Sequence, residues 1–336
     1  MFKPTKLKSL AAVAGACFAM FAAAPANAYV YALSHLEVQD FRLVITPTAA
    51  TTVGRYSFNL ANTASMFGSN APASSAACGG TTSSTTCGVA PVLNAAMANA
   101  PPSNLLRTEN NFAFLNANGV NSYSGSDSVI TTAELVTGTP TSLNQIAESL
   151  LNANGQAQAN SEIQSNTSLS ISFSIVGGPA TLNLNFMADP DQRADIAGAI
   201  GDYLAQSNMN ASITLTKSNG GGSIGWTPQG TAANDCTSSI AGAVCTELAD
   251  TEDLNNNASA FFNPDTNDNS YEVGNVFSAF GIRIANLSAG NYTIALNSLT
   301  STSISRAVPE PGSLALIGVA LLGLGFGASR RQVKQG

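Results

Sequence analysis

The segment LSISFSIVGGPATLNLNFM (Leu169–Met187) decides the fold class of this chain. Apolar residues alternate with serine in Leu169–Val176 and with polar residues, mostly asparagine, in Ala180–Met187. A period of two is typical of a β-strand that buries one face and exposes the other. Gly177-Gly178-Pro179 separates the two runs, so we expect a β-hairpin here.

The same alternation recurs on both sides of this segment, which predicts a body built mainly of strands. We expect the two segments nearest the N-terminus to pair with each other, and the last two to pair across a short turn. The further strands are expected at Val38–Ile45, Tyr56–Leu60, Ala211–Lys217, Ser278–Leu287 and Tyr292–Leu299.

A short motif precedes the last of these strands. Leu287-x-x-Gly290-x-Tyr292 resembles the tyrosine corner of Greek-key sandwiches, in which the tyrosine hydroxyl bonds back to a nearby backbone group. An ordinary hairpin with a buried tyrosine is the alternative, and it leads to the same fold class.

Two segments have helical spacing instead. Ser142–Gln158 places its leucines and Ile146 on one face, which predicts an amphipathic helix, whereas Asp191–Gln206 is ambiguous because glycines interrupt it. Ala71–Thr86, rich in Ser, Thr and Ala, is expected to be a flexible surface loop. The expected fold is mainly β: an antiparallel β-sandwich of Greek-key or jelly-roll type with one or two surface helices.

Four of the five cysteines fall in this body as two pairs with identical spacing. Four cysteines allow three connectivities, and the repeated spacing favours pairing within each loop. A zinc site is the alternative, but the chain has one histidine and no Cys-x-x-Cys. We therefore expect the disulfides Cys78–Cys87 and Cys236–Cys245.

The N-terminus has the layout of a secretory signal peptide, expected at residues 1–28. Three lysines precede the apolar run Leu10–Phe21, and an Ala-x-Ala site, Ala26 to Ala28, precedes Tyr29. This pattern predicts cleavage by signal peptidase before Tyr29 and an oxidising compartment, which permits disulfides.

The C-terminal segment 308–336 contains a short motif, an apolar run and a basic tail. The motif is Val308-Pro309-Glu310-Pro311, and Gly312–Ala328 follows it without a charge. That run is at the lower length limit of a transmembrane helix, and Arg330-Arg331 in the tail 329–336 supplies the positive charge expected on the cytoplasmic side. We expect a single C-terminal transmembrane helix at 312–328.

These residues closely resemble the PEP-CTERM sorting signal. The resemblance implies an exported protein of a Gram-negative bacterium that makes exopolysaccharide. It also implies a membrane protease partner, exosortase, which cuts near the Pro-Glu-Pro motif and sends the protein to the cell surface or matrix. PEP-CTERM proteins carry many unrelated bodies, so the resemblance implies nothing about the activity of this one.

The body, residues 29–307, is expected to be a single extracytoplasmic domain. It has seven basic residues against nineteen acidic ones, a net charge of −12. Such a surface repels phosphate backbones, and the chain has no basic patch with interleaved aromatic residues, which excludes nucleic acid as an expected partner.

Catalytic chemistry finds little support in the sequence. His35 is the only histidine, and its place in an expected strand favours a surface or half-buried structural residue. Asp189-Pro190-Asp191, with Asp195 and Asp202, offers paired carboxylates for glycoside hydrolysis, but the chain is poor in tryptophan, which usually lines sugar clefts. A turn that closes a strand is the simpler interpretation of Asp189-Pro190. We expect no catalytic residues.

The acidic segment Asp250–Glu272 is the best candidate site for a ligand. Asp265, Asn267 and Asn269 match the first half of a calcium loop, but Ser270 stands in place of the glycine that an EF-hand needs. A solvated Asn/Asp loop without a ligand is the favoured interpretation, and calcium binding through a loop of another type is the alternative.

The sequence thus predicts an exported, non-enzymatic protein that is anchored transiently in the inner membrane and then placed at the cell surface or in the exopolysaccharide matrix. We expect no cofactor, and contacts with polysaccharide through Asn/Ser/Thr-rich loops. A secreted polysaccharide-active hydrolase and a calcium-dependent adhesion module are the two alternatives.

Overall fold

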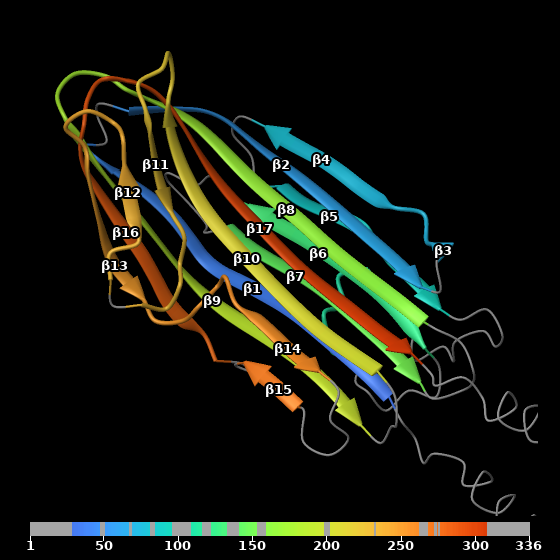
Figure 1. Ribbon diagram of the computed structural model, residues 1–336. Helices are drawn as coiled ribbons and strands as arrows, with labels where there is room; N and C mark the ends of the chain where they lie inside the picture. The colour runs from blue at the N-terminus through green and yellow to red at the C-terminus, as the bar shows by residue number, and fades with distance from the viewer. Residues whose placement is uncertain are drawn as a thin grey trace, which may run out of the picture.

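The computed structural model describes residues 29–47, 51–66, 69–80, 85–95, 109–115, 122–132, 141–152, 159–197, 202–231, 233–261, 268–271, 274 and 276–307. Their regular secondary structure is entirely β, in two antiparallel sheets that pack face to face (Figure 1). This confirms the mainly β class and places no helix among the described residues.

The first sheet contains eight of the described strands. In spatial order they are β13 (Val244–Asp250), β16 (Ser278–Leu287), β9 (Ala180–Ala197), β1 (Tyr29–Thr46), β7 (Thr141–Asn152), β6 (Tyr123–Thr132) and β5 (Thr85–Ala95), with β15 (Asp268–Tyr271) pairing the far end of β9.

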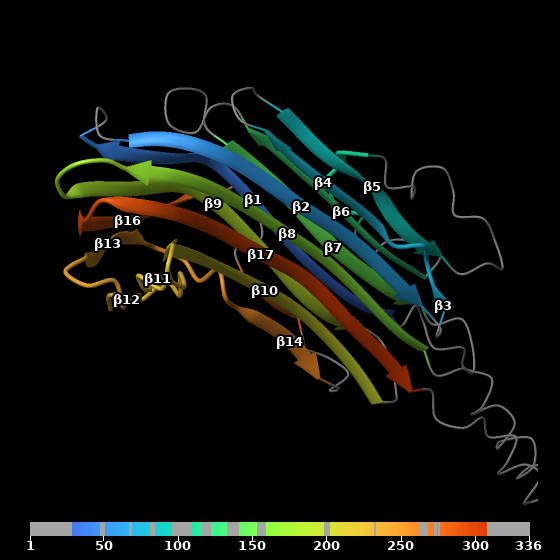
Figure 2. The same ribbon diagram turned by 90° about the horizontal axis from the view of Figure 1, so that it is seen from above.

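The second sheet contains nine strands within the same residues. Their order is β12 (Cys236–Ser238), β11 (Ser223–Trp226), β10 (Asp202–Lys217), β17 (Gly290–Ala307), β8 (Ala159–Ile175), β2 (Thr51–Met66) and β3 (Ser69–Asn70), with β14 (Asn257–Phe261) beside β10 and β4 (Ser74–Gly80) beside β2. Figure 2 shows β2, β8, β17 and β10 running side by side along one layer.

The predicted strands exist, but the predicted hairpins are wrong. β8 belongs to the second sheet and β9 to the first, so the chain crosses between the sheets at Gly177–Pro179 instead of turning back on itself. The chain crosses between the sheets in the same way from β1 to β2 and from β16 to β17, so these pairs of strands are not hairpins either. An arch between two sheets and a hairpin within one sheet bury the same alternate residues, so the period of two cannot distinguish them.

The predicted helix Ser142–Gln158 is also wrong where the structure describes it, because Thr141–Asn152 forms β7. Both faces of β7 are buried: Ala147 packs between the sheets, while Ile146 and Leu150 belong to a second apolar cluster on the outer face. A strand buried on both faces has a nearly continuous apolar run, which imitates helical spacing. In Asp191–Gln206, the described residues lie in β9 and β10.

The stretch Ala71–Thr86, expected to be a surface loop, contains β4 and the start of β5. β4 pairs with β2 over seven residues, from Tyr56 opposite Gly80 to Asn62 opposite Ser74. Small residues are tolerated in this strand because it lies at a sheet edge, where pairing on one side suffices.

The interior between the sheets is apolar at one end and hydroxyl-rich at the other. At the apolar end, Phe186 stacks on Phe280 with ring centroids 5.0 Å apart and contacts Trp226 at 6.0 Å. At the other end the sheets are joined by polar contacts such as Ser34 Oγ to Asn208 O, 2.9 Å, and Ser149 Oγ to Thr302 Oγ1, 2.8 Å. Short side chains that bond across the interface bring the two sheets close together here.

The tyrosine corner is confirmed. The Tyr292 hydroxyl donates a 2.7 Å hydrogen bond to the carbonyl oxygen of Ser288, and the ring stacks on Phe173. The corner stands where the chain crosses from β16 to β17, so it fixes a connection between the two sheets.

The predicted signal peptide (1–28) and transmembrane helix (312–328) lie outside the described residues. Within the described part of the chain, no helix has the length and apolar character to cross a membrane.

Candidate functional site

Both predicted disulfides are present, and each one joins edge strands of different sheets. Cys78 of β4 is bonded to Cys87 of β5, with the Cα atoms 6.1 Å apart, on one side of the molecule. Cys236 of β12 is bonded to Cys245 of β13, with the Cα atoms 5.9 Å apart, on the opposite side. No described ladder joins β4 to β5 or β12 to β13. Each disulfide therefore closes one open side of the two-sheet body covalently.

Three carboxylates gather beside the second disulfide. One oxygen from each of Asp235, Glu247 and Asp250 lies within 4.8 Å of the others. Asp235 directly precedes Cys236 at the start of β12, and Glu247 lies two residues after Cys245 on β13, so the disulfide fixes the backbone next to both acids. All three side chains are half-buried.

Hydrogen-bond donors fix part of each carboxylate in this acidic cluster. Glu247 Oε2 accepts from Trp226 Nε1 and from the Asp235 amide, each at 3.1 Å. Asp235 Oδ2 accepts from the Thr231 hydroxyl at 2.9 Å. These hydrogen bonds hold the carboxylates in place, and each residue offers a carboxylate oxygen as a possible metal ligand.

Asp250 is the member with the most perturbed electrostatics. Its Oδ2 accepts from the amides of Gln229 and Gly230, at 2.9 and 3.1 Å, while its Oδ1 is buried and has no hydrogen-bond partner. Burial, and then the negative charges of Glu247 and Asp235, raise the pKa of Asp250 from 3.8 to about 6, although the amide hydrogen bonds oppose the shift. An all-oxygen donor set of this kind suits a hard divalent cation such as Ca²⁺.

The calcium residues expected from the sequence lie elsewhere. Asp265 and Asn267 are outside the described residues, and Asn269 belongs to β15, opposite Ala194 of β9. The acidic segment Asp250–Glu272 does include Asp250, but the two partners of Asp250 in the cluster, Asp235 and Glu247, come earlier in the chain. The one sequence signal for these partners is that Asp235 and Glu247 lie within two residues of Cys236 and Cys245.

His35 is buried in the first sheet, at 6% exposure, which corrects the expectation of a surface or half-buried residue. Its Nδ1 lies 2.9 Å from Asp191 Oδ2 and its Nε2 lies 2.9 Å from Asn144 Oδ1. Phe114 packs edge-on against the imidazole, with ring centroids 5.5 Å apart. Asp191 also accepts from the Gly274 amide through Oδ1, so both of its oxygens are engaged.

Asp189 lies beside this pair and is 1% exposed. Neither of its oxygens has a hydrogen bond of good geometry. Burial, and then repulsion from Asp191, raise the pKa of Asp189 from 3.8 to about 6, while the Val276 amide and His35 lower it. Glu37, directly opposite on β1, adds to the repulsion.

The turn predicted at Asp189-Pro190 is wrong, because β9 continues through both residues. Pairing of β9 with β16 ends at Ala188, and pairing with β15 begins at Gln192. Pro190 therefore has no strand partner on that side, a position where a sheet tolerates proline.

The remaining carboxylates of the predicted hydrolase site do not join a cleft. Asp195 accepts from the Tyr29 hydroxyl at 2.6 Å and pairs with Arg193 at 3.0 Å. Asp202 belongs to β10 of the other sheet. Tyr29, expected to be the residue after signal-peptide cleavage, is the first residue of β1.

Two buried acids that the sequence reasoning missed hold the segment 109–115 over the first sheet. Asp127 Oδ2 accepts from the Asn110 amide at 2.9 Å, and Glu148 Oε2 accepts from the Leu115 amide at 3.1 Å. Glu148 also accepts a 2.6 Å hydrogen bond from the Tyr31 hydroxyl. Their roles depend on a contact between distant segments, which no local pattern reveals.

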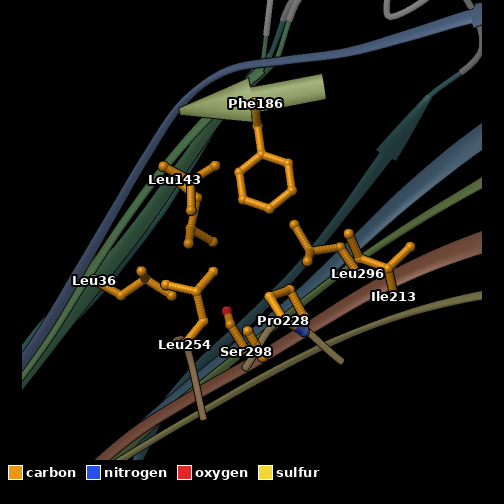
Figure 3. Close-up of a pocket in the computed structure, with 10 residues that line it drawn as sticks. Leu36, Leu143, Phe186, Ile213, Pro228, Leu254, Leu296 and Ser298 are labelled. Carbon is orange, nitrogen blue, oxygen red and sulfur yellow. The ribbon is translucent and has the colours of Figure 1, made fainter. Parts of the chain in front are cut away.

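A small cavity lies between the sheets, and Figure 3 shows the side chains that point into it, among them Leu36, Leu143, Phe186 and Leu254. Its free volume is about 10 Å³. That is about the space of a single water probe, and the lining is almost entirely apolar. The cavity is a packing gap and has no room for a substrate.

Comparisons with known proteins identify only the end of the chain. Residues 307–331 match the PEP-CTERM protein-sorting motif. No curated protein and no solved structure matches the chain. The matched residues include the predicted motif Val308–Pro311 and Arg330-Arg331, all of which lie outside the described residues. The chain therefore carries the PEP-CTERM sorting motif, the signal of exported proteins that are substrates of exosortase.

Proposed function

We propose that this chain is a non-enzymatic structural and adhesive protein of the cell surface or exopolysaccharide matrix, delivered there by exosortase. The observation that carries the proposal is the position of the sorting motif relative to the fold. The match begins at Ala307, which is also the last residue of β17. The folded body thus runs directly into the sorting motif.

This junction favours release of an intact body. β17 is an inner strand of the second sheet, paired with β10 up to Ala307 and with β8 up to Arg306. A cut near Val308–Pro311 removes no strand, so the body keeps its pairing and both disulfides. The transient anchor is expected to be the 312–328 helix.

The engaged carboxylates support a non-enzymatic role over the hydrolase alternative. General acid catalysis on a glycoside needs two carboxyl groups that face a substrate cleft. Asp191 and Asp195 are instead committed to partners within the protein, and Asp189 is buried beside them. These acids contribute to the structure of the first sheet.

Fractionation of the native bacterium tests the sorting role. The intact chain is compared with a variant that lacks residues 308–336 and keeps the signal peptide. We expect the intact chain to lose its C-terminal segment, as mass spectrometry of the mature protein would show, and to collect at the surface or in the matrix. The truncated chain should be exported without that placement. Equal retention of both forms in the membrane would reject the proposal.

Calcium-dependent adhesion is a second candidate, favoured by the acidic cluster of Asp235, Glu247 and Asp250. A divalent cation there would relieve the repulsion among three carboxylates and tie β12 and β13 together beside Cys236–Cys245. A calcium titration followed by thermal unfolding tests this candidate, and an unchanged melting temperature would count against it.

A further inference from the structure

The last residues of β17 are held on both edges and on their inner face. β10 pairs with β17 up to Ala307 and β8 pairs with it up to the residue before, so both edges of the strand end are occupied (Figure 2). Toward the first sheet, Ile304 is fully buried in an apolar cluster that includes Val30 of β1. Thr302 Oγ1 lies 2.8 Å from Ser149 Oγ of β7. The strand is therefore part of the core up to the residue at which the sorting motif begins.

A protease that binds its substrate as an extended chain needs backbone groups that are free to pair. An extended peptide commonly binds a protein by adding a strand to it, and its own N–H and C=O groups form the hydrogen bonds. In β17 these groups are already paired with β10 and β8. Peeling the strand end from its sheet would expose Ile304 and would leave backbone groups of both neighbouring strands unpaired. The described ladders end at Ala307, so the first residue beyond them is Val308.

Little chain separates the end of β17 from the expected transmembrane helix. Only the motif Val308–Pro311 lies between Ala307 and the apolar run Gly312–Ala328. Even when fully extended, a motif of this length spans at most about 14 Å. Before the cut, the folded body would therefore stand next to the membrane surface, where a membrane protease can reach the motif without unfolding the body.

We propose that exosortase cuts this chain while β17 is still in its sheet, at a peptide bond on the C-terminal side of Val308. The inference rests on the proposed sorting function and adds the order of events. The body folds first, and its last strand then limits how far upstream the protease can bind. The C–N bond breaks, the acyl group passes to water or to a surface nucleophile, and the amine leaves with the C-terminal segment. The mature chain keeps all of β17 and the first part of the motif.

An engineered disulfide across the end of β17 tests this order of events. Ser305 of β17 lies opposite Leu204 of β10, and both side chains are half-buried. Ser305→Cys combined with Leu204→Cys should bond the strand end to its neighbour, since paired positions on adjacent strands have the spacing that a disulfide needs. Mass spectrometry of the exported protein would verify the bond. We expect pulse-chase labelling in the producing bacterium to show that the C-terminal segment is lost at the rate of the unmodified chain.

The opposite mechanism, in which the strand end leaves the sheet before the cut, predicts a different rate. The engineered disulfide would then slow the loss of the segment about tenfold or more, because it blocks local opening of the strand. Ala295→Cys combined with Thr214→Cys is the matched control, since these half-buried residues are opposite each other on the same two strands, far from the strand end. Thermal unfolding should verify that both variants fold.

The C-terminal mass of the mature protein is a second test, and it needs no variant. The mature chain should contain Val308. With Gly-Ser-Gly-Ser inserted between Ala307 and Val308, the same bond should be cut and the mature mass should rise by the mass of the insertion alone, because the motif determines the position of the bond.

Two results would overturn the inference: a mature chain that ends within β17, or slower processing with the disulfide at Ser305 and Leu204 than with the control pair. Either of them would leave the sorting role intact, since the chain would still be cut by its protease. A chain that is never cut would reject the sorting role together with this inference.

Discussion

Cys236 and Cys245 are nine residues apart in the sequence, yet they lie in edge strands of different sheets. Cys78 and Cys87 have the same relationship on the opposite side. A mainly β body with long strands has four exposed sheet edges, and two short loops closed by disulfides tie these edges together in pairs. Both bonds need an oxidising compartment, which agrees with export.

Replacing Cys236 and Cys245 together by serine should lower the free energy of unfolding by about 2.5–3 kcal/mol, the chain entropy of a loop of this length. Denaturant unfolding of the variant measures the loss. The Cys78/Cys87 pair of serine substitutions is the matched comparison, with an equal loop and an expected equal loss. A loss below about 0.5 kcal/mol in both would show that the sheets need no covalent closure.

The pair formed by His35 and Asp191 should contribute more than an exposed ion pair. Asp191→Ala leaves the imidazole and the Gly274 amide without their acceptor inside the protein, so we expect unfolding to require about 2–4 kcal/mol less. Asp40→Asn is the control: Asp40 pairs with Arg42 at 3.4 Å, but its side chain is 57% exposed. Asparagine removes the charge and tolerates the positive φ of this residue, 54°. It should cost below about 0.5 kcal/mol. Equal effects of the two substitutions would contradict the buried network.

The positions of the strands could be predicted from the sequence, but their partners could not. Leu169–Val176 and Ala180–Met187 are strands as their alternation predicts, and the Gly177–Pro179 break between them is real. That break could turn the chain within one sheet or carry it to the other sheet, and the outcome depends on which strands pair with each other. β8 pairs with β17, which lies more than a hundred residues further along the chain. Such distant pairing leaves no trace in a local pattern.

The candidate site was predictable only in part, for the same reason. The disulfides follow from repeated spacing, a local property. The acidic cluster forms because β11, β12 and β13 bring Asp235, Glu247 and Asp250 together, and the buried Asp189 acquires its environment from β1. The helix expected around Ile146 failed because the outer face of β7 is covered by 109–115, a segment whose contact the sequence does not indicate.

Asp189 should make stability depend on pH. Its pKa is about 6 in the folded protein and near 3.8 when unfolded, so the folded state favours the protonated form. The stabilisation that protonation gives is complete below about pH 4 and is lost as the pH rises through 6. Asp189→Asn should therefore be more stable than the unmodified protein at pH 7.5, by about 1–2 kcal/mol after allowance for solvent screening, and indistinguishable from it at pH 4. Urea unfolding at the two pH values measures the difference. A variant that is less stable at pH 7.5 would mean that the charged carboxylate has a favourable partner.

Asp250 should respond to calcium as well as to pH. If the acidic cluster takes Ca²⁺, the ion stabilises the folded state by RT ln(1 + [Ca²⁺]/Kd), about 1.4 kcal/mol at ten times Kd. Calcium titrated to about 10 mM, which covers the affinity range of extracellular modules, should then raise the melting temperature by several degrees. Asp250→Asn and Glu247→Gln should abolish the increase, whereas Asp40→Asn, which removes an exposed acid on the first sheet, should preserve it.

Asp250→Asn should also be more stable than the unmodified protein at pH 7.5 without calcium, since the buried charge is gone. A melting temperature that calcium leaves unchanged would contradict the cation site, and an increase that survives in Asp250→Asn would place the ion elsewhere.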